Sequence, residues 1–143
     1  MSRLKIDIPF ACDAEVADLV RLFESCELPY ERWTHRAHLA VAVTYLQRYP
    51  LNVATDRART YIPRYNRARG DANGYHETIT VLFMRLVERE MRVVPARETA
   101  ALINDLADRF QISWLLRYYS PERLWSAEAR AAFVPPDLQA LDF

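Results

Sequence analysis

Apolar residues recur at intervals of three or four along nearly the whole chain, a spacing typical of amphipathic α-helices. Only two glycines interrupt the 143 residues. A helix with an apolar stripe has to bury that stripe against other helices, so the pattern predicts an all-α fold. The segment 5–10, KIDIPF, would allow one strand at most.

Capping residues and prolines divide this pattern into about five main helices. Asp13 and Thr34 are predicted to cap the first two, and Gly70 is predicted to follow the C-cap of the third. Pro63 predicts a kink or a break inside the third helix. The expected helices cover residues 13–26, 35–49, 52–70, 75–93 and about 96–110.

The last thirty residues are less regular. Ser120 and Ser126 are predicted to cap two short helices, because each begins a short helical pattern and the first is followed by proline. An extended tail is expected from Pro135 onward. The whole chain, residues 1–143, is therefore predicted to form a single-domain helical bundle.

Charge and cysteine content restrict the class of function. Basic and acidic residues number 19 each, so no net field attracts nucleic acid or an anionic membrane. No apolar run approaches the roughly 20 residues of a membrane span, and no signal peptide is recognisable. Cys12 and Cys26 lack metal-binding or redox spacing, which predicts reduced thiols and a cytoplasmic location. The sequence leaves open whether the protein forms a homodimer, because no heptad repeat supports pairing between two copies.

All three histidines fall in two similar stretches, WTHRAHLAV and GYHETITVL, at the predicted starts of the second and fourth helices. His35 and His38 lie three residues apart and share one helix face. Helices that alternate in direction would place both starts at one end of the bundle. His35, His38 and His76 are therefore expected to point inward in one layer.

Three inward imidazoles beside a carboxylate form a typical metal site. Glu24 is the chosen carboxylate, with Glu27, Glu31 and Glu77 as alternatives. Histidines alone would suit Zn²⁺, and added carboxylates would suit Fe²⁺ or Mn²⁺. Such a site requires the three imidazoles within about 4 Å of a common point.

Two polar residues near the same end are candidate catalytic groups. Glu77 points about 100° away from His76 around the helix, and could act as a general base or orient an imidazole. Asn66, in the run RYNRARG, could bind a substrate or orient His76. Among Arg32, Arg36, Arg64, Arg67 and Arg69, one turned inward would offer a clamp for an anionic substrate.

The strings WTHRAHLAVA, YNRARG, GYHETIT and YYSPERLWSAEAR, between Phe23 and Pro136, resemble those of a small family of uncharacterised bacterial proteins. This resemblance implies no catalytic residues. In architecture the chain also resembles the DinB/YfiT-like bundles, which hold a metal through three helical histidines. Those proteins pair HxxxH with a third histidine, whereas this chain has HxxH, and its pair comes first.

The leading hypothesis is a metal-dependent enzyme acting on a small organic molecule. The metal would activate water or a carbonyl for hydrolase or lyase chemistry, or oxygen if it is iron. One alternative is a metal-free acid–base enzyme or small-ligand binder that uses the same histidines. Another is a non-catalytic interaction module that docks through the segment 114–125.

Overall fold

The computed structural model describes residues 4–95 and 97–143, and its regular elements in those ranges are all helical. The all-α prediction is confirmed. The five longer helices are α1 (Asp13–Glu24), α2 (His35–Arg48), α3 (Leu51–Ala68), α4 (Glu77–Val93) and α5 (Thr99–Arg109). The shorter elements are the 3₁₀ helices η1 (Tyr30–Arg32) and η2 (Ile112–Arg117), and the α-helices α6 (Pro121–Leu124) and α7 (Ala127–Ala131).

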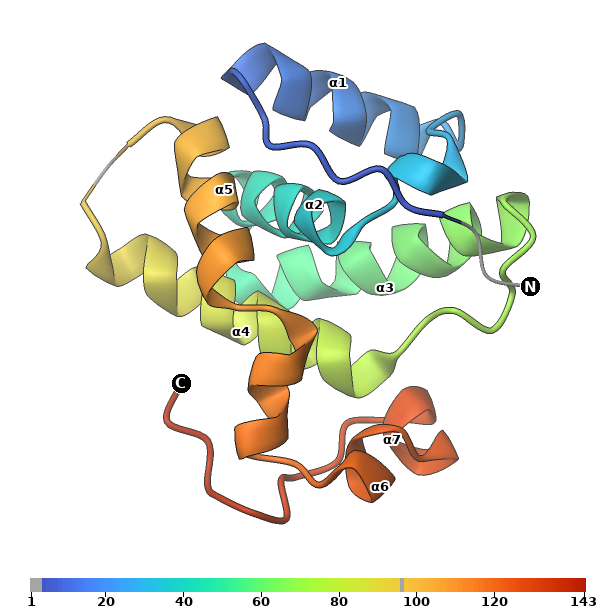
Figure 1. Cartoon of the computed structure of the whole chain (residues 1–143), viewed down its shortest axis with the longest axis vertical. Coiled ribbons are helices and arrows are strands. Elements are labelled where there is room, and N and C mark those ends of the chain that lie inside the picture. The colour runs from blue at the N-terminus through green and yellow to red at the C-terminus, as the bar shows by residue number, and fades with distance from the viewer. Residues whose placement is uncertain (1–3, 96) are drawn as a thin grey trace.

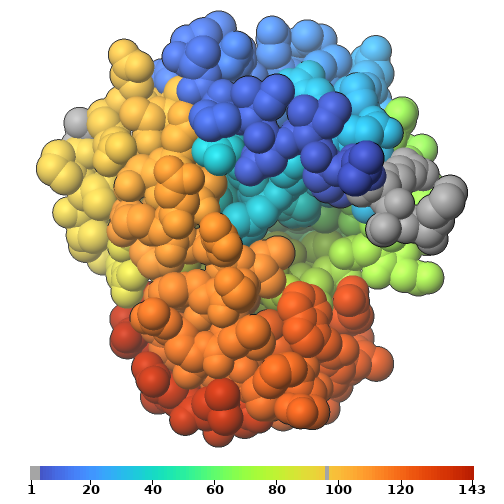
Figure 2. All heavy atoms as spheres, viewed as in Figure 1, coloured from blue at the N-terminus to red at the C-terminus, as the bar shows by residue number. Residues whose placement is uncertain are grey.

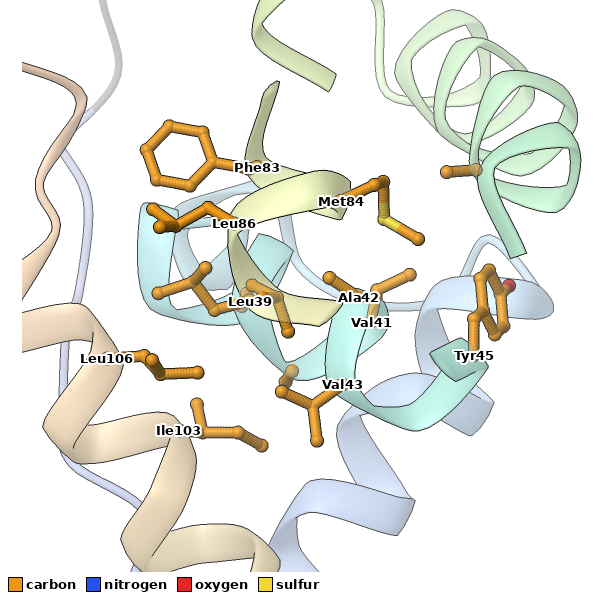
Figure 3. Close-up of a cluster of buried hydrophobic side chains, with 14 of the residues drawn as sticks. Leu39, Val41, Ala42, Val43, Tyr45, Phe83, Met84, Leu86, Ile103 and Leu106 are labelled. Atoms are coloured by element: carbon orange, nitrogen blue, oxygen red, sulfur yellow. The ribbon is translucent and has the colours of Figure 1, made fainter. Parts of the chain in front are cut away.

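Helix α2 lies at the centre of the molecule and contacts α1, α3, α4 and α5 (Figure 1). Its buried residues cover almost the whole circumference of the helix. Ala40 and Val43, for example, are fully buried. Figure 3 shows side chains of α2 packed against α4 on one side and α5 on the other. A helix that is apolar all round is typical of a buried core element.

Helix α3 runs as one element through Pro63, where the sequence predicted a kink or break. Its end follows the prediction, because Gly70 has a φ of 81°. The Gly70 N–H donates to the carbonyl of Arg67 at 3.2 Å, and the Asp71 N–H donates to that of Asn66 at 2.8 Å. These two bonds form a Schellman motif, which closes the helix and fixes the loop that follows.

Helix α1 ends in the same motif without a glycine. Cys26 occupies the left-handed position, with a φ of 63°. Its N–H donates to the Phe23 carbonyl, and the Glu27 N–H donates to the Leu22 carbonyl. The predicted helix 13–26 includes Cys26, whereas the structure places this residue half-buried in the turn after α1.

The cap predictions are confirmed with two exceptions. Asp13 lies inside the first turn of α1, and its carboxylate accepts hydrogen bonds from the Thr99 and Ala100 N–H groups, so it caps α5 instead. Helix α4 begins two residues later than predicted, at Glu77, with His76 as its N-cap. Residue 96, the predicted start of the fifth helix, lies outside the described residues, as do residues 1–3 of the predicted domain. Thr34, Ser120 and Ser126 cap α2, α6 and α7 as expected.

The C-terminal region, from η2 to the end of the chain, packs along α4 (Figure 1). The buried Thr78 hydroxyl on α4 lies 2.8 Å from the Ala129 carbonyl and accepts from the Val134 N–H at 3.2 Å. The extended tail returns to α4, where Arg85 donates to the Phe143 carbonyl. None of the helices in the described ranges has the length and apolar character needed to cross a bilayer.

Candidate functional site

A cavity of about 530 Å³ lies between α2, α3 and α4, and all three histidines line it. Figure 2 shows the surface hollowed where the segments coloured cyan, green and orange meet. Most of the wall is apolar or aromatic, and exposed residues of the N-terminal segment lie at its edge. The residues that determine its chemistry are Trp33, His35, His38, Asn66, His76 and Phe83.

His35 projects from the first residue of α2. Its Nε2 lies 2.7 Å from the Phe110 carbonyl oxygen, and its ring meets Phe83 edge-on at 4.9 Å between centroids. A carbonyl only accepts hydrogen bonds, so Nε2 carries the proton in this pair. Burial lowers the pKa of His35, which favours the neutral ring. The Nδ1 atom of this neutral ring is therefore an acceptor, and it has no partner among the residues that the structure describes.

His38 lies one turn further along α2, with its ring 3.8 Å from that of Trp33. Its Nδ1 lies 2.7 Å from the Thr34 carbonyl oxygen and is the protonated nitrogen by the same argument. Burial lowers the pKa of His38 to about 4. The ring is neutral at pH 7, with Nε2 as its acceptor atom.

His76 is engaged through both ring nitrogens. Its Nε2 donates to the Leu124 carbonyl at 2.6 Å, and its Nδ1 accepts from the Ile79 N–H at 3.1 Å. The ring also meets Trp125 edge-on, with centroids 5.8 Å apart. His76 thus caps α4 and ties it to the C-terminal region, and burial lowers its pKa.

Asn66 projects from the last turn of α3 and is 3% exposed. Its side-chain oxygen is buried and has no hydrogen-bond partner in the part of the chain that the structure describes. An unpaired buried amide oxygen costs about 1–3 kcal/mol, so native proteins rarely keep one without a reason. Asn66 also lines the cavity.

The two predicted carboxylates lie outside the cavity lining. Glu24 accepts hydrogen bonds from the Tyr45 hydroxyl at 2.9 Å and from Arg57 at 3.5 Å, away from the histidines. Glu77 accepts from Arg59 at 2.8 Å and from the Tyr75 hydroxyl at 2.6 Å. Burial alone would raise the pKa of Glu77, but these two hydrogen bonds lower it, so the carboxylate is ionised and engaged.

Arg36 is the arginine that turns inward, and its partner belongs to the protein itself. Its Nε donates to the Asp7 carboxylate at 3.0 Å, and its Nη1 donates to the Asn104 side-chain oxygen at 2.9 Å. Asn104 in turn pairs with both backbone groups of Phe10. This network holds the N-terminal segment across the start of α2, where Lys5 and Asp7 line the cavity edge. The inward arginine is therefore occupied, and the predicted clamp for an anionic substrate is not free.

The arrangement does not fit the predicted three-histidine metal site. Metal ligation requires a free lone pair on each imidazole, and both His76 nitrogens already have protein partners. Within residues 4–95 and 97–143, no three histidine, cysteine, aspartate or glutamate side chains are grouped to hold a metal ion. Within the described part of the chain, His35 Nδ1, His38 Nε2 and the Asn66 oxygen have no protein partner.

Sequence reasoning missed several parts of this site. The Trp33 ring, which lies 3.8 Å from that of His38, was not among the predicted site residues. The roles of Phe110 and Leu124 rest on backbone carbonyls, which no sequence pattern reveals. A histidine directly before an acidic first turn was the signal for the His76 cap.

No protein-family model, curated protein or solved structure matches this chain.

Proposed function

We propose that the protein binds a small, largely apolar organic molecule in the cavity between α2, α3 and α4. One observation carries this proposal: Asn66, whose buried oxygen has no partner among residues 4–95 and 97–143, lines a cavity that also holds two neutral imidazoles. Ligand sites in proteins are typically apolar clefts of roughly 300–1,000 Å³ with a few convergent polar groups. The cavity has this size and this composition.

The chemistry of the histidines favours binding over proton transfer. A general base works best when its pKa lies near the working pH. The pKa of His38 is about 4, so its imidazole accepts a hydrogen bond at pH 7 but holds a proton poorly. The metal-dependent enzyme stays a prediction from the sequence. Both ring nitrogens of His76 already have protein partners, which leaves neither of them to bind a metal ion.

A cytoplasmic location forms part of the proposal. Cys12 and Cys26 are both unpaired, and Cys12 is exposed. Free exposed thiols are typical of proteins kept in a reducing compartment.

Binding of toluene and of indole, followed by amide chemical shifts, tests the proposal. Dry apolar cavities take up such rings, so we expect both to perturb amides around Ile79 and Phe83. Ile79→Trp fills the cavity from a half-buried position and should abolish the response. Leu46→Trp adds the same ring at a half-buried position of α2 outside the cavity, and should leave the response intact.

Failure of both rings to perturb cavity amides in the folded protein would overturn the proposal. A response that survives Ile79→Trp would overturn it too.

A metal test separates the rival hypothesis, using Zn²⁺ and Fe²⁺ titrations of wild type, His76→Ala and His76→Asn. Asparagine is a good N-cap, so we expect His76→Asn to be more stable than His76→Ala by about 1 kcal/mol. Stoichiometric metal binding lost in both variants would favour the metal site instead.

A further inference from the structure

Two imidazoles of the cavity wall are held so that they present hydrogen-bond acceptors. His35 is fixed by the Phe110 carbonyl, which takes the proton on Nε2 and leaves a lone pair on Nδ1. His38 is fixed in the opposite tautomer by the Thr34 carbonyl, which leaves a lone pair on Nε2. Neither ring can turn its N–H toward a ligand without breaking a 2.7 Å bond to a backbone carbonyl. The two anchors therefore determine what the imidazoles offer.

Asn66 adds a third acceptor from α3. Its side-chain oxygen is buried and unpaired among residues 4–95 and 97–143. The amide nitrogen of the same side chain is a donor, so a hydroxyl group could both donate and accept beside Asn66.

Three hydroxyl groups of the cavity wall are directed at protein acceptors. The Tyr30 hydroxyl donates to Asp71, the Tyr75 hydroxyl to Glu77 and the Thr80 hydroxyl to the His76 carbonyl. The guanidinium of Arg36, which could have bound an anion, holds Asp7. An ionised carboxylate only accepts hydrogen bonds, and would face lone pairs at His35 and His38. Such a ligand is disfavoured at this part of the wall.

Resting on the binding function proposed above, we infer that the ligand is a neutral ring compound with a hydroxyl or ring N–H that donates to His35 Nδ1, His38 Nε2 or Asn66 Oδ1. Aromatic side chains surround these atoms: the Trp33 ring lies against that of His38 at an interplanar angle of 31°, and Phe83 meets His35 edge-on. Planar rings pack well against such walls, because an aromatic pair contributes more binding free energy than its buried apolar area alone would give.

Three naphthalenes of nearly equal size test the inference by calorimetry with the full chain at pH 7. 2-Naphthol carries a donor, 2-methoxynaphthalene has lost it, and 2-naphthoate offers only acceptors. We expect 2-naphthol to bind at least tenfold more tightly than either of the others. His38→Phe keeps a ring beside Trp33 and removes the acceptor, and Asn66→Leu removes the amide. Each should reduce the preference for 2-naphthol over 2-methoxynaphthalene at least threefold.

The outcomes separate the two proposals. Equal or tighter binding of 2-methoxynaphthalene or 2-naphthoate would overturn the donor preference, while leaving a ligand cavity in place. Binding of none of the three, together with no response to toluene or indole, would overturn the binding function itself. A preference for 2-naphthol that persists unchanged in both variants would show that other atoms recognise the donor, which also overturns the inference. Circular dichroism of each variant confirms that the helices are intact.

Discussion

Asn66 and Asn104 show that an asparagine side chain can stabilise the fold or can be kept at a cost in stability. Asn104 is paired at both ends, with Arg36 and the backbone of Phe10. Asn66 leaves a buried oxygen unpaired in the described structure. Stability alone would favour an apolar residue at position 66, because a buried polar atom without a partner costs free energy. An asparagine kept at such a position is typical of a binding site.

Asn66→Leu should therefore stabilise the protein. We expect the free energy of unfolding, measured in urea, to rise by about 1–2 kcal/mol because the unpaired oxygen is removed. Asn104→Leu is the matched control, and it should lower the same quantity by about 2–3 kcal/mol because several partners lose their bonds. Destabilisation of both variants by similar amounts would show that Asn66 is a structural residue.

The low pKa of His38 predicts how stability depends on pH. The pKa is 6.5 in the unfolded chain and about 4 in the folded one, so the unfolded state binds more protons between these values. Stability is then complete above pH 6.5 and falls as the pH drops toward 4, by roughly 3 kcal/mol from this residue. In the variant His38→Asn, the asparagine side chain at this position does not titrate.

We expect the unfolding free energy of wild type to fall more steeply between pH 6.5 and 4 than that of His38→Asn. The difference between the two curves cancels most of the contribution of carboxylates, which titrate in both proteins. Parallel curves would contradict the pKa of about 4, and a titration of the His38 ring by NMR would measure that pKa directly.

The two helix ends built as Schellman motifs differ in what sequence could reveal. Gly70 after α3 was predicted, because glycine after a helical pattern is a strong signal for the left-handed position. Cys26 after α1 was missed, because a cysteine among apolar residues is usually part of the core. The capping serines and Thr34 were predictable for the same local reason as Gly70.

Cys26→Gly should stabilise the end of α1. The left-handed conformation costs a residue with a side chain about 1 kcal/mol or more, and glycine adopts it freely. Glycine also loses more backbone entropy on folding, so we expect a net gain of about 0.5–1 kcal/mol in urea unfolding. Cys26→Ala keeps the strain and removes the thiol, and should give no such gain. A loss of stability with glycine would indicate that thiol contacts outweigh the strain.

Contacts between distant parts of the chain account for what sequence could not predict. Local patterns predicted the helices, and their alternation predicted that the starts of α2 and α4 share one end, where the three histidines line one cavity. The partners of each side chain depend on packing between elements. Glu24 lies beside Tyr45 and Arg57, and Asp13 caps a helix more than eighty residues further on.

Asp13→Ala tests this long-range cap. We expect a loss of about 1 kcal/mol in unfolding free energy, together with faster hydrogen exchange in the first turn of α5, because the Ala100 N–H loses its 2.8 Å acceptor. Asp13→Asn keeps an acceptor oxygen and should recover most of the loss. Asp18→Ala removes an exposed acidic residue of α1 that pairs with Arg21 at 3.4 Å, and should cost under about 0.5 kcal/mol. Unchanged exchange in α5 would contradict the cap.

The cavity wall is assembled from the N-terminal segment, α2, α3, α4 and the C-terminal region, so it exists only in the folded chain. Whatever fills it draws the folding equilibrium toward the native state by mass action. At a hundred times its dissociation constant, a ligand adds about 2.7 kcal/mol to the free energy of unfolding. For a domain of this size that corresponds to a rise in melting temperature of roughly 5–10 °C. The melting temperature can therefore serve as the readout of a metabolite screen, whatever reaction, if any, the bound molecule undergoes.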